Sequence, residues 1–342
     1  MIEFHEKVEI SRFYDPSEDK EKQEEIVIRH DPLTGKSCRI LDKSLPISKE
    51  ADIEDEIVSG FCPFCPDNIY DIGARDSRVL NNKILENGEA VLLSNISPYA
   101  ERSLVIRLTE KHYIPIDDFQ KKHFTDALEL ILKYLERSSN QGYANIMMNY
   151  LKPAGSSIVH PHIQLLVSDT AMDHQKRVVK AAKEYHEENG SDYWSDLLEK
   201  ERGSDRYLEK YGTWEWKTPY APRGLEHIQG ISLKDFRSMG KNALQDLSSG
   251  IVDTLRYYDD LDFNSFNLAL SVSPKEKTEG SATIIDIVAR SSFDKYYWCD
   301  VFALTKLQDE PYSNKFPEDI AKEARTFFGS DQLREALEQN NK

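Results

Sequence analysis

The feature that most constrains the fold is an order of strands and a helix that occurs twice in the 342 residues. In the first copy, period-2 and period-3.6 patterns of apolar residues cover residues 90–94, 103–108, 117–138, 145–149 and 158–168. In the second copy they cover residues 214–217, 226–231, 233–258, 266–272 and 283–289. A Gly-Ser pair also precedes the last strand of each copy, at residues 155–156 and 280–281. We therefore predict an internal duplication of a strand–strand–helix–strand–strand unit.

Such units form mixed or antiparallel sheets with helices packed on them, so the predicted class is α+β. We expect an N-terminal half over residues 1–170 and a degenerate C-terminal half over residues 171–342. Further helices are predicted at 172–188 and 317–328. The charged run at 18–25 indicates a solvated arm or a short helix, and residues 71–87 resemble a loop. No G-x-G-x-x-G or Walker motif argues for a doubly wound nucleotide fold.

Composition excludes several classes of function. Lys plus Arg total 44 and Asp plus Glu total 60, giving a net charge of −16 that disfavours nucleic acid or an anionic membrane as a partner. No apolar run reaches the ~20 residues that a membrane-spanning helix needs, and the charged N-terminus lacks the apolar stretch of a secretory signal. Four cysteines are too few for a disulfide framework. We therefore expect a globular, cytoplasmic protein.

The densest chemical signal is the segment His160-Pro161-His162-Ile163-Gln164. In a strand, His160, His162 and Gln164 would share one face while the residues between them point to the core. Two surface histidines on an edge strand are the plainer alternative. We favour a functional site, because a polar H-x-H-x-Q face within an apolar strand needs a partner.

A second signal lies upstream, where Cys62 and Cys65 form a C-x-x-C between prolines. Two thiolates spaced in this way can bind one metal, although a redox pair is the competing interpretation. His112 and His160 would complete a closed Cys2His2 set, which predicts one structural zinc ion per chain. On its own, His112 would be taken for an exposed loop residue.

Together these residues resemble the galactose-1-phosphate uridylyltransferase family, a branch of the histidine-triad superfamily. The likeness rests on C-P-F-C-P, a later single histidine, and an asparagine followed by H-P-H-x-Q; it covers residues 30–170 and continues weakly to residue 328. It implies that Cys62, Cys65, His112 and His160 bind zinc. It also implies that His162 is a nucleophile and that Gln164 hydrogen-bonds the phosphoryl group on it.

The resemblance extends to substrate contacts. Asn149 matches a position that contacts nucleotide phosphates, and Asn95 matches a base- or ribose-contacting position. The loop Gly155-Ser156-Ser157 would line the path of the phosphates. Family members are commonly homodimers, so the resemblance also implies a dimer.

The predicted chemistry is nucleotidyl transfer through a covalent intermediate on a neutral imidazole, whose unperturbed pKa is about 6.5. The best single expectation is uridylyl transfer between UDP-glucose and a hexose 1-phosphate such as galactose 1-phosphate. Sugar-contacting positions of the family fall on Leu304 and Glu310, and Arg39 is the only candidate for an expected arginine pair. These departures keep two alternatives open. One is a phosphorylase that uses inorganic phosphate with an ADP-sugar or a dinucleoside polyphosphate, and the other is a zinc-stabilised nucleotide-binding protein without catalysis.

Overall fold

The structure is a computed structural model that describes residues 2–43, 60–138, 142–274, 282–291 and 300–329. Its centre is a ten-stranded sheet in which every neighbouring pair is antiparallel. The strand order is β4-β5-β6-β8-β7-β12-β13-β11-β10-β9. The first five strands are β4 Leu85–Asn87, β5 Ala90–Ser94, β6 Arg102–Arg107, β7 Tyr143–Tyr150 and β8 His162–Ser168. The other five are β9 Tyr207–Tyr211, β10 Trp214–Lys217, β11 Leu225–Ser232, β12 Ser265–Val272 and β13 Thr283–Arg290.

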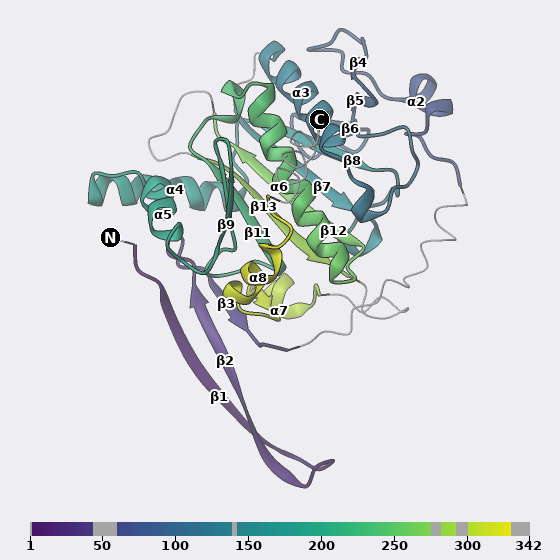
Figure 1. The fold of residues 1–342 in the computed structure, drawn as a ribbon. Coiled ribbons are helices and arrows are strands. Elements are labelled where there is room, and N and C mark those ends of the chain that lie inside the picture. The colour runs from purple at the N-terminus through teal and green to yellow at the C-terminus, as the bar shows by residue number, and fades with distance from the viewer. Residues whose placement is uncertain (1, 44–59, 139–141, 275–281, 292–299, 330–342) are drawn as a thin grey trace, which may run out of the picture.

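This strand order confirms the predicted α+β duplication. Counted from one edge the strands are β4-β5-β6-β8-β7, and counted from the other edge the strands of the second half follow in the corresponding order, β9-β10-β11-β13-β12. Each half contains three strands, a short 3-10 helix, a long helix and two more strands. The helices are α3 Lys121–Arg137 and α6 Lys241–Asp260, preceded by η1 Ile116–Asp118 and η3 Phe236–Ser238. β7 and β12 pair at the centre and join the halves into one sheet (Figure 1). The second Gly-Ser pair, at 280–281, lies outside the described residues.

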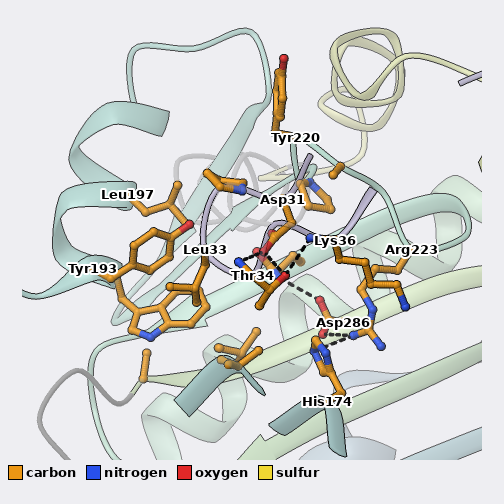
Figure 2. A pocket seen from close by; sticks show the side chains of 18 of the residues that line it. Asp31, Leu33, Thr34, Lys36, His174, Tyr193, Leu197, Tyr220, Arg223 and Asp286 are labelled. Carbon is orange, nitrogen blue, oxygen red and sulfur yellow. Dashed lines mark hydrogen bonds and ion pairs between the residues drawn. The ribbon is translucent and has the colours of Figure 1, made fainter. Parts of the chain in front are cut away.

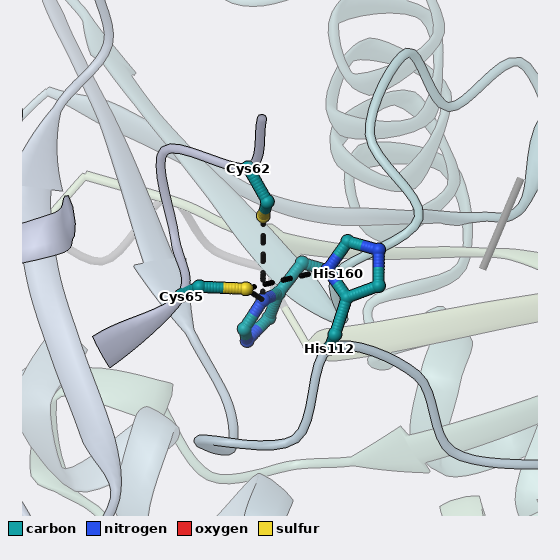
Figure 3. Close-up of side chains that lie close together, drawn as sticks. All are labelled: Cys62, Cys65, His112 and His160. Carbon is teal, nitrogen blue, oxygen red and sulfur yellow. Dashed lines mark hydrogen bonds between the residues drawn. The ribbon is translucent and has the colours of Figure 1, made fainter. Parts of the chain in front are cut away.

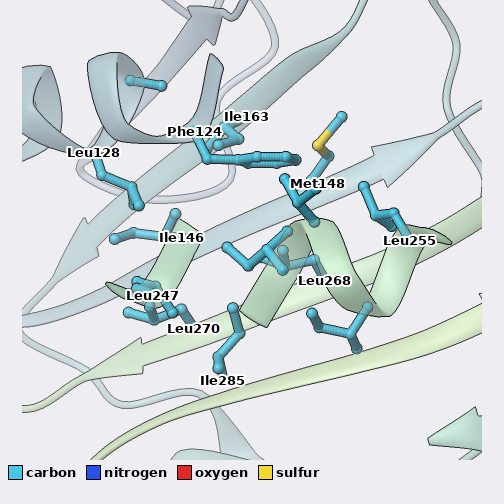
Figure 4. Close-up of a cluster of buried hydrophobic side chains, with 14 of the residues drawn as sticks. Phe124, Leu128, Ile146, Met148, Ile163, Leu247, Leu255, Leu268, Leu270 and Ile285 are labelled. Atoms are coloured by element: carbon cyan, nitrogen blue, oxygen red, sulfur yellow. The ribbon is translucent and has the colours of Figure 1, made fainter. Parts of the chain in front are cut away.

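The main core lies between one face of this sheet and the two long helices. Phe124 and Leu128 of α3 and Leu247 and Leu255 of α6 pack against alternate residues of the central strands (Figure 4). These strand residues include Ile146, Met148, Ile163, Leu268, Leu270 and Ile285. Because side chains alternate along a strand, the residues between them face the other side of the sheet. The long helices therefore leave that open face to the polar side chains of both halves.

Two smaller apolar clusters cover parts of the open face, one over each half. Over the first half, Cys62, Phe64 and Ile69 pack on Val91, Leu93 and Val105 next to α2 Pro66–Ile72. Over the second half, residues of α5 Tyr193–Glu201 pack on Ile231 and Ile284, beside α4 Asp173–Asn189.

A second, smaller sheet is built from both ends of the described chain. Its strand order is β1-β2-β3-β14, with β1 His5–Asp15, β2 Lys20–His30, β3 Ser37–Ile40 and β14 Tyr312–Ser313. β1 and β2 form a long hairpin that extends away from the body (Figure 1). The remaining elements are α7 Ala303–Leu307, α8 Pro317–Ala324 and η2 Lys152–Ala154. No helix in these described parts is long and apolar enough to cross a membrane.

Several local predictions were wrong. The run at 18–25 forms the exposed turn and the start of β2, so the solvated arm was right and the short helix was wrong. The stretch 71–87 contains the end of α2 and β4 as well as loop. The repeated unit has a third, edge strand that was missed in both copies, β4 and β9. The strand predicted at 158–168 begins at His162, so His160 and Pro161 precede it.

Tight packing explains the tryptophans of β10. Trp214 and Trp216 are fully buried on the core face of the sheet. A Cβ atom on Gly250 of α6 would lie 2.0 Å from Trp216 Cε2. Glycine at this position therefore allows the helix to cross the strand at close range.

Candidate functional site

The candidate site lies on the open face of the first half, at the N-terminal end of β8. His162 pairs with Arg107 of β6, and Gln164 pairs with Val105 of β6 and Met147 of β7. Ile163 between them is in the main core, so His162 and Gln164 share the open face as the sequence predicts. His160 does not share this alternation because it lies before the strand.

The ring of His162 is held in one tautomer. Its Nδ1 lies 2.8 Å from the carbonyl oxygen of His160. A carbonyl oxygen can only accept a hydrogen bond, so Nδ1 carries the proton and Nε2 keeps its lone pair. The side chain is only 7% exposed, and this burial lowers its pKa. A neutral imidazole with a free lone pair on Nε2 is the form that acts as a nucleophile.

Two residues that the sequence analysis missed support this ring. Phe64, inside the C-x-x-C, packs against His162 with the ring centroids 5.2 Å apart. Arg107 is 1% exposed and donates hydrogen bonds to the carbonyl oxygens of Glu89 and Phe64, at 2.9 and 3.4 Å. Arg107 therefore ties the cysteine segment to the strand that pairs with His162.

The four predicted metal ligands converge, although up to 98 residues separate them in sequence (Figure 3). Cys62 Sγ and Cys65 Sγ lie 3.6 and 3.7 Å from His160 Nδ1, and Cys65 Sγ lies 3.4 Å from His112 Nδ1. All four ligand atoms are within 4.8 Å of one another. A tetrahedral zinc ion with ordinary Zn–S and Zn–N bonds separates sulfur from nitrogen by about 3.5 Å. The observed distances fit such an ion.

His160 links the cluster to His162. Its Nε2 donates a hydrogen bond to the carbonyl oxygen of Thr109 at 2.7 Å, which leaves the Nδ1 lone pair facing the two thiols. Burial lowers the pKa of His160 to about 4, so the ring is neutral near pH 7, as a metal ligand must be. The backbone carbonyl of the same residue orients His162. A metal that fixes His160 would therefore also fix the ring of His162.

Asn149 comes next to His162 across the sheet. If the register of β7 and β8 is continued by two residues, Asn149 is level with His162, one strand away. Asn267 of β12 pairs with Asn149 and donates from Nδ2 to its Oδ1 at 2.7 Å. Asn267 also donates to the carbonyl oxygen of Ala154 at 2.8 Å and accepts from Arg290. These contacts leave Asn149 with its Nδ2 donors available on the open face.

The sequence analysis did not identify Asn267 or Arg290. Both lie in the second half, and Arg290 is itself anchored by Asp300 at 2.9 Å. The second half thus sets the orientation of a side chain in the first-half site.

The loop between β7 and β8 is compact. Gly155 adopts a left-handed conformation with φ of 86°, which favours glycine. Ser156 is buried, with its hydroxyl donating to the carbonyl oxygen of Ile158 at 2.7 Å and its N–H to Leu151 at 3.1 Å. Ser156 therefore shapes the loop, whereas Ser157 is exposed at its surface.

Asn95 lies at the far end of β6 from His162. Its N–H donates to the carbonyl oxygen of Ser103, and its Oδ1 accepts from the N–H of Ser97. Ser103 and Arg107 are four residues apart on β6, which corresponds to about 13 Å. The structure therefore does not bring Asn95 next to His162, and only an extended ligand would contact both.

Comparisons with solved structures place this fold in a known class. A GalT-like protein from Arabidopsis thaliana superposes with a TM-score of 0.68 and 18% identity, covering 87% of this chain and 98% of that chain. An ADP-glucose phosphorylase from Arabidopsis thaliana, with bound ADP-glucose, gives 0.68 and 17%, covering 87% and 97%. A uridylyltransferase gives 0.64 and 17%, covering 88% and 97%. The chain therefore has the GalT-like fold.

At the level of sequence, no protein-family model matches the chain. An uncharacterised protein of Archaeoglobus fulgidus is 40% identical over 331 residues, which cover 96% of this chain and 99% of that protein. The chain belongs to the same family as this archaeal protein.

Proposed function

We propose that the protein transfers a nucleoside monophosphate group through a covalent bond to His162. The observation that carries this proposal is the hydrogen bond from His162 Nδ1 to the carbonyl oxygen of His160, which leaves Nε2 as the nucleophilic atom. Gln164 on the same face and Asn149 on the next strand supply amide groups beside it. We also propose that residues 1–170 supply the catalytic side chains and that residues 171–342 hold them in position.

The reaction has two displacements. Nε2 of His162 attacks the α-phosphorus of a nucleoside diphosphate compound, a P–N bond forms, and the P–O bond to the β-phosphate breaks. The phosphate group of an acceptor then attacks the same phosphorus, the P–N bond breaks, and His162 returns to its starting form. Amide N–H groups of Gln164 and Asn149 would stabilise charge on the phosphoryl oxygens. In the loop at 155–157 this role would fall to Ser157, because the N–H groups of Gly155 and Ser156 donate to Lys152 and Leu151.

A zinc ion held by Cys62, Cys65, His112 and His160 would be structural, since four protein ligands close the tetrahedral site. Its effect on the reaction would be to hold His160, whose carbonyl orients His162. No step of the transfer uses the metal.

The acceptor distinguishes two forms of the proposal. Uridylyl transfer from UDP-glucose to a hexose 1-phosphate such as galactose 1-phosphate is the first. The second is a phosphorylase on the same scaffold, with inorganic phosphate as acceptor and an ADP-sugar or dinucleoside polyphosphate as donor. One observation favours the phosphorylase. The carboxylate of Glu310, at a position expected to contact the sugar, accepts a hydrogen bond from Ser37 at 2.5 Å and pairs with Arg39 at 3.2 Å. Because these contacts occupy the carboxylate, it is not available to bind a hexose acceptor.

The test uses UDP-glucose and ADP-glucose, each labelled at the α-phosphate. Protein incubated with the correct donor will carry acid-labile label, and the matching acceptor, a hexose 1-phosphate or inorganic phosphate, will discharge it. The variant His162→Ala should take up no label, whereas His5→Ala, a histidine on the exposed hairpin, should label normally. Nucleotide binding without any label would instead identify a binding protein that has lost catalysis.

A further inference from the structure

The open face of the second half carries a cavity of its own. A cavity that is partly open to solvent lies between the sheet, α4, α5 and the turn that joins β2 to β3 (Figure 2). Its floor is one lateral row of the sheet, in which Lys217 pairs with Gln229 and Gln229 pairs with Asp286. The same row continues through Ala269 and Met147 to Gln164.

This row also measures how far the cavity is from the candidate site. Asp286 and Gln164 are three strand spacings apart, which is about 14 Å. The cavity is therefore separate from the nucleotidyl-transfer site and occupies the corresponding face of the other half.

Some polar side chains of the lining already have hydrogen-bond partners within the protein. His227 Nδ1 accepts from the backbone N–H of Arg223 at 3.0 Å, and its Nε2 donates to Asp286 at 3.0 Å. Asp286 accepts further hydrogen bonds from Gln229 at 2.8 Å and from the Arg223 guanidinium at 3.3 Å. The Arg223 guanidinium also donates to His174 Nε2 at 2.9 Å. The charges of Asp286 and Arg223 therefore offset each other.

Lys217 differs from these residues, because no described side chain is seen to accept a hydrogen bond from it. Its side chain is 3% exposed, and its one ion-pair partner within the described residues is Glu201, 3.7 Å away. That distance is beyond a hydrogen bond. Glu201 is meanwhile bound by Arg206 at 3.0 Å and by the Ser204 hydroxyl at 2.6 Å. Glu201 alone therefore does not satisfy this ammonium, and because Lys217 lines the cavity, a bound molecule can supply a hydrogen-bond acceptor there.

Asp31 lines the cavity on the turn between β2 and β3 (Figure 2). Its Oδ1 accepts from both the N–H and the hydroxyl of Thr34, at 2.7 and 2.6 Å. These contacts leave Oδ2 available, and Asp31 forms no ion pair with a described residue. The nearby Lys36 is paired with Asp309 at 2.6 Å. Beyond the groups that other charges already hold, which include Glu201, the lining offers one ammonium and one carboxylate, and their charges cancel.

The remaining wall is apolar. Tyr193, Trp194 and Leu197 of α5 line the cavity together with Leu33 and Ile284. Aromatic and aliphatic walls with a few polar groups are typical of sites for small organic ligands, and an indole provides a flat surface for a ring.

We infer that this cavity binds a neutral ring compound with hydroxyl groups, a sugar or a nucleoside, whose ring contacts Trp194 and whose hydroxyls lie between Asp31 and Lys217. A hydroxyl can donate to a carboxylate and accept from an ammonium, so such a ligand satisfies both groups. An anionic ligand would satisfy Lys217 but would meet repulsion from Asp31. The inference is independent of the chemistry at His162.

The test is calorimetric titration of the full chain with glucose, galactose, adenosine and uridine, followed by their phosphate esters. One of the two neutral classes should bind, and the sugar and nucleoside arms identify which. Lys217→Met and Asp31→Asn should each weaken that binding by roughly tenfold or more, as expected for a lost hydrogen bond to a charged group. Lys210→Met, which replaces an exposed lysine on the neighbouring strand β9 outside the cavity lining, is the control and should bind like the wild type.

Three results would overturn the inference: no binding of either neutral class at millimolar concentration, binding that both cavity variants leave unchanged, or binding of phosphate esters alone. If Lys217→Met does not fold, Asp31→Asn decides the question, because its amide keeps an acceptor for Thr34. Labelling at His162 is measured separately. A negative result in the calorimetric titration therefore does not affect the conclusion from labelling. A negative result in labelling likewise does not affect the conclusion about the cavity.

Discussion

Replacing Asn267 tests whether the second half of the chain takes part in the chemistry. Asn267 makes three hydrogen bonds, to Asn149, to the carbonyl of Ala154 and from Arg290. Each contributes about 0.5–1.5 kcal/mol, so Asn267→Leu should lower the free energy of unfolding by roughly 1.5–4.5 kcal/mol. Asn267→Asp should cost less stability, because the carboxylate still accepts from Arg290.

The variant Asn267→Asp has the sharper effect on activity. A carboxylate cannot donate to Asn149 Oδ1, so the Asn149 amide will turn its Nδ2 toward the introduced carboxylate and its oxygen toward the substrate phosphates. Losing one hydrogen bond to a charged phosphoryl group costs about 1.5–3 kcal/mol. That corresponds to a labelling rate roughly 10- to 150-fold slower.

The assay is the single-turnover rate of protein labelling at saturating donor, together with urea unfolding. Asn145→Asp is the matched control, since Asn145 lies on β7 and the same face but hydrogen-bonds to Gln175 instead. Its labelling rate should stay at the wild-type value. A wild-type rate in Asn267→Asp would refute the claim that Asn267 orients a catalytically useful Asn149.

Three further predictions follow from other contacts. Protein purified without chelators should contain about one zinc ion per chain. The variant His112→Ala should lose metal and unfold at a lower temperature, with a smaller effect on nucleotide affinity. Wild-type protein that contains no metal would contradict the site. Gly250→Ala should destabilise the fold by about 1–3 kcal/mol or more, because its Cβ would lie 2.0 Å from Trp216, whereas Gly240→Ala, with open space around it, should change unfolding far less. Burial lowers the pKa of His174 to about 4, so between pH 6.5 and 4 only the unfolded chain takes up this proton. The free energy of unfolding should therefore decrease as the pH is lowered through that window. Urea unfolding at pH 7.5 and pH 5 should show a smaller decrease for His174→Asn than for the wild type.

Much of the architecture was predictable because it depends on local periodicity. The long helices and the central strands have apolar residues at clear intervals, and the duplication follows from their order. The edge strands β4 and β9 were missed because they lie at the borders of the sheet and mix apolar residues with charged and amide residues, in the sequences LEN and YLEKY. The start of β8 was placed too early because an apolar pattern cannot distinguish a strand from the irregular segment before it.

The candidate site was predictable only where residues of one chemical type occur close together in sequence. The C-x-x-C and H-P-H-x-Q segments could be identified, and His112 could be added by counting ligands. Asn267 and Arg290 act across the junction of β7 and β12, and nothing in their local sequence indicates that pairing. Asp286 did leave a signal, since it is the single charged residue within the apolar run Ile284–Ala289.

The central claim is that Nε2 of His162 forms a bond to phosphorus. Protein quenched in alkali during turnover, digested and analysed by mass spectrometry should yield a peptide containing His162 that has gained one nucleoside monophosphate group. Mild acid should remove the group, because a phosphoramidate is acid-labile. Turnover with no modified peptide, or with the nucleotide on a different residue, would contradict the account.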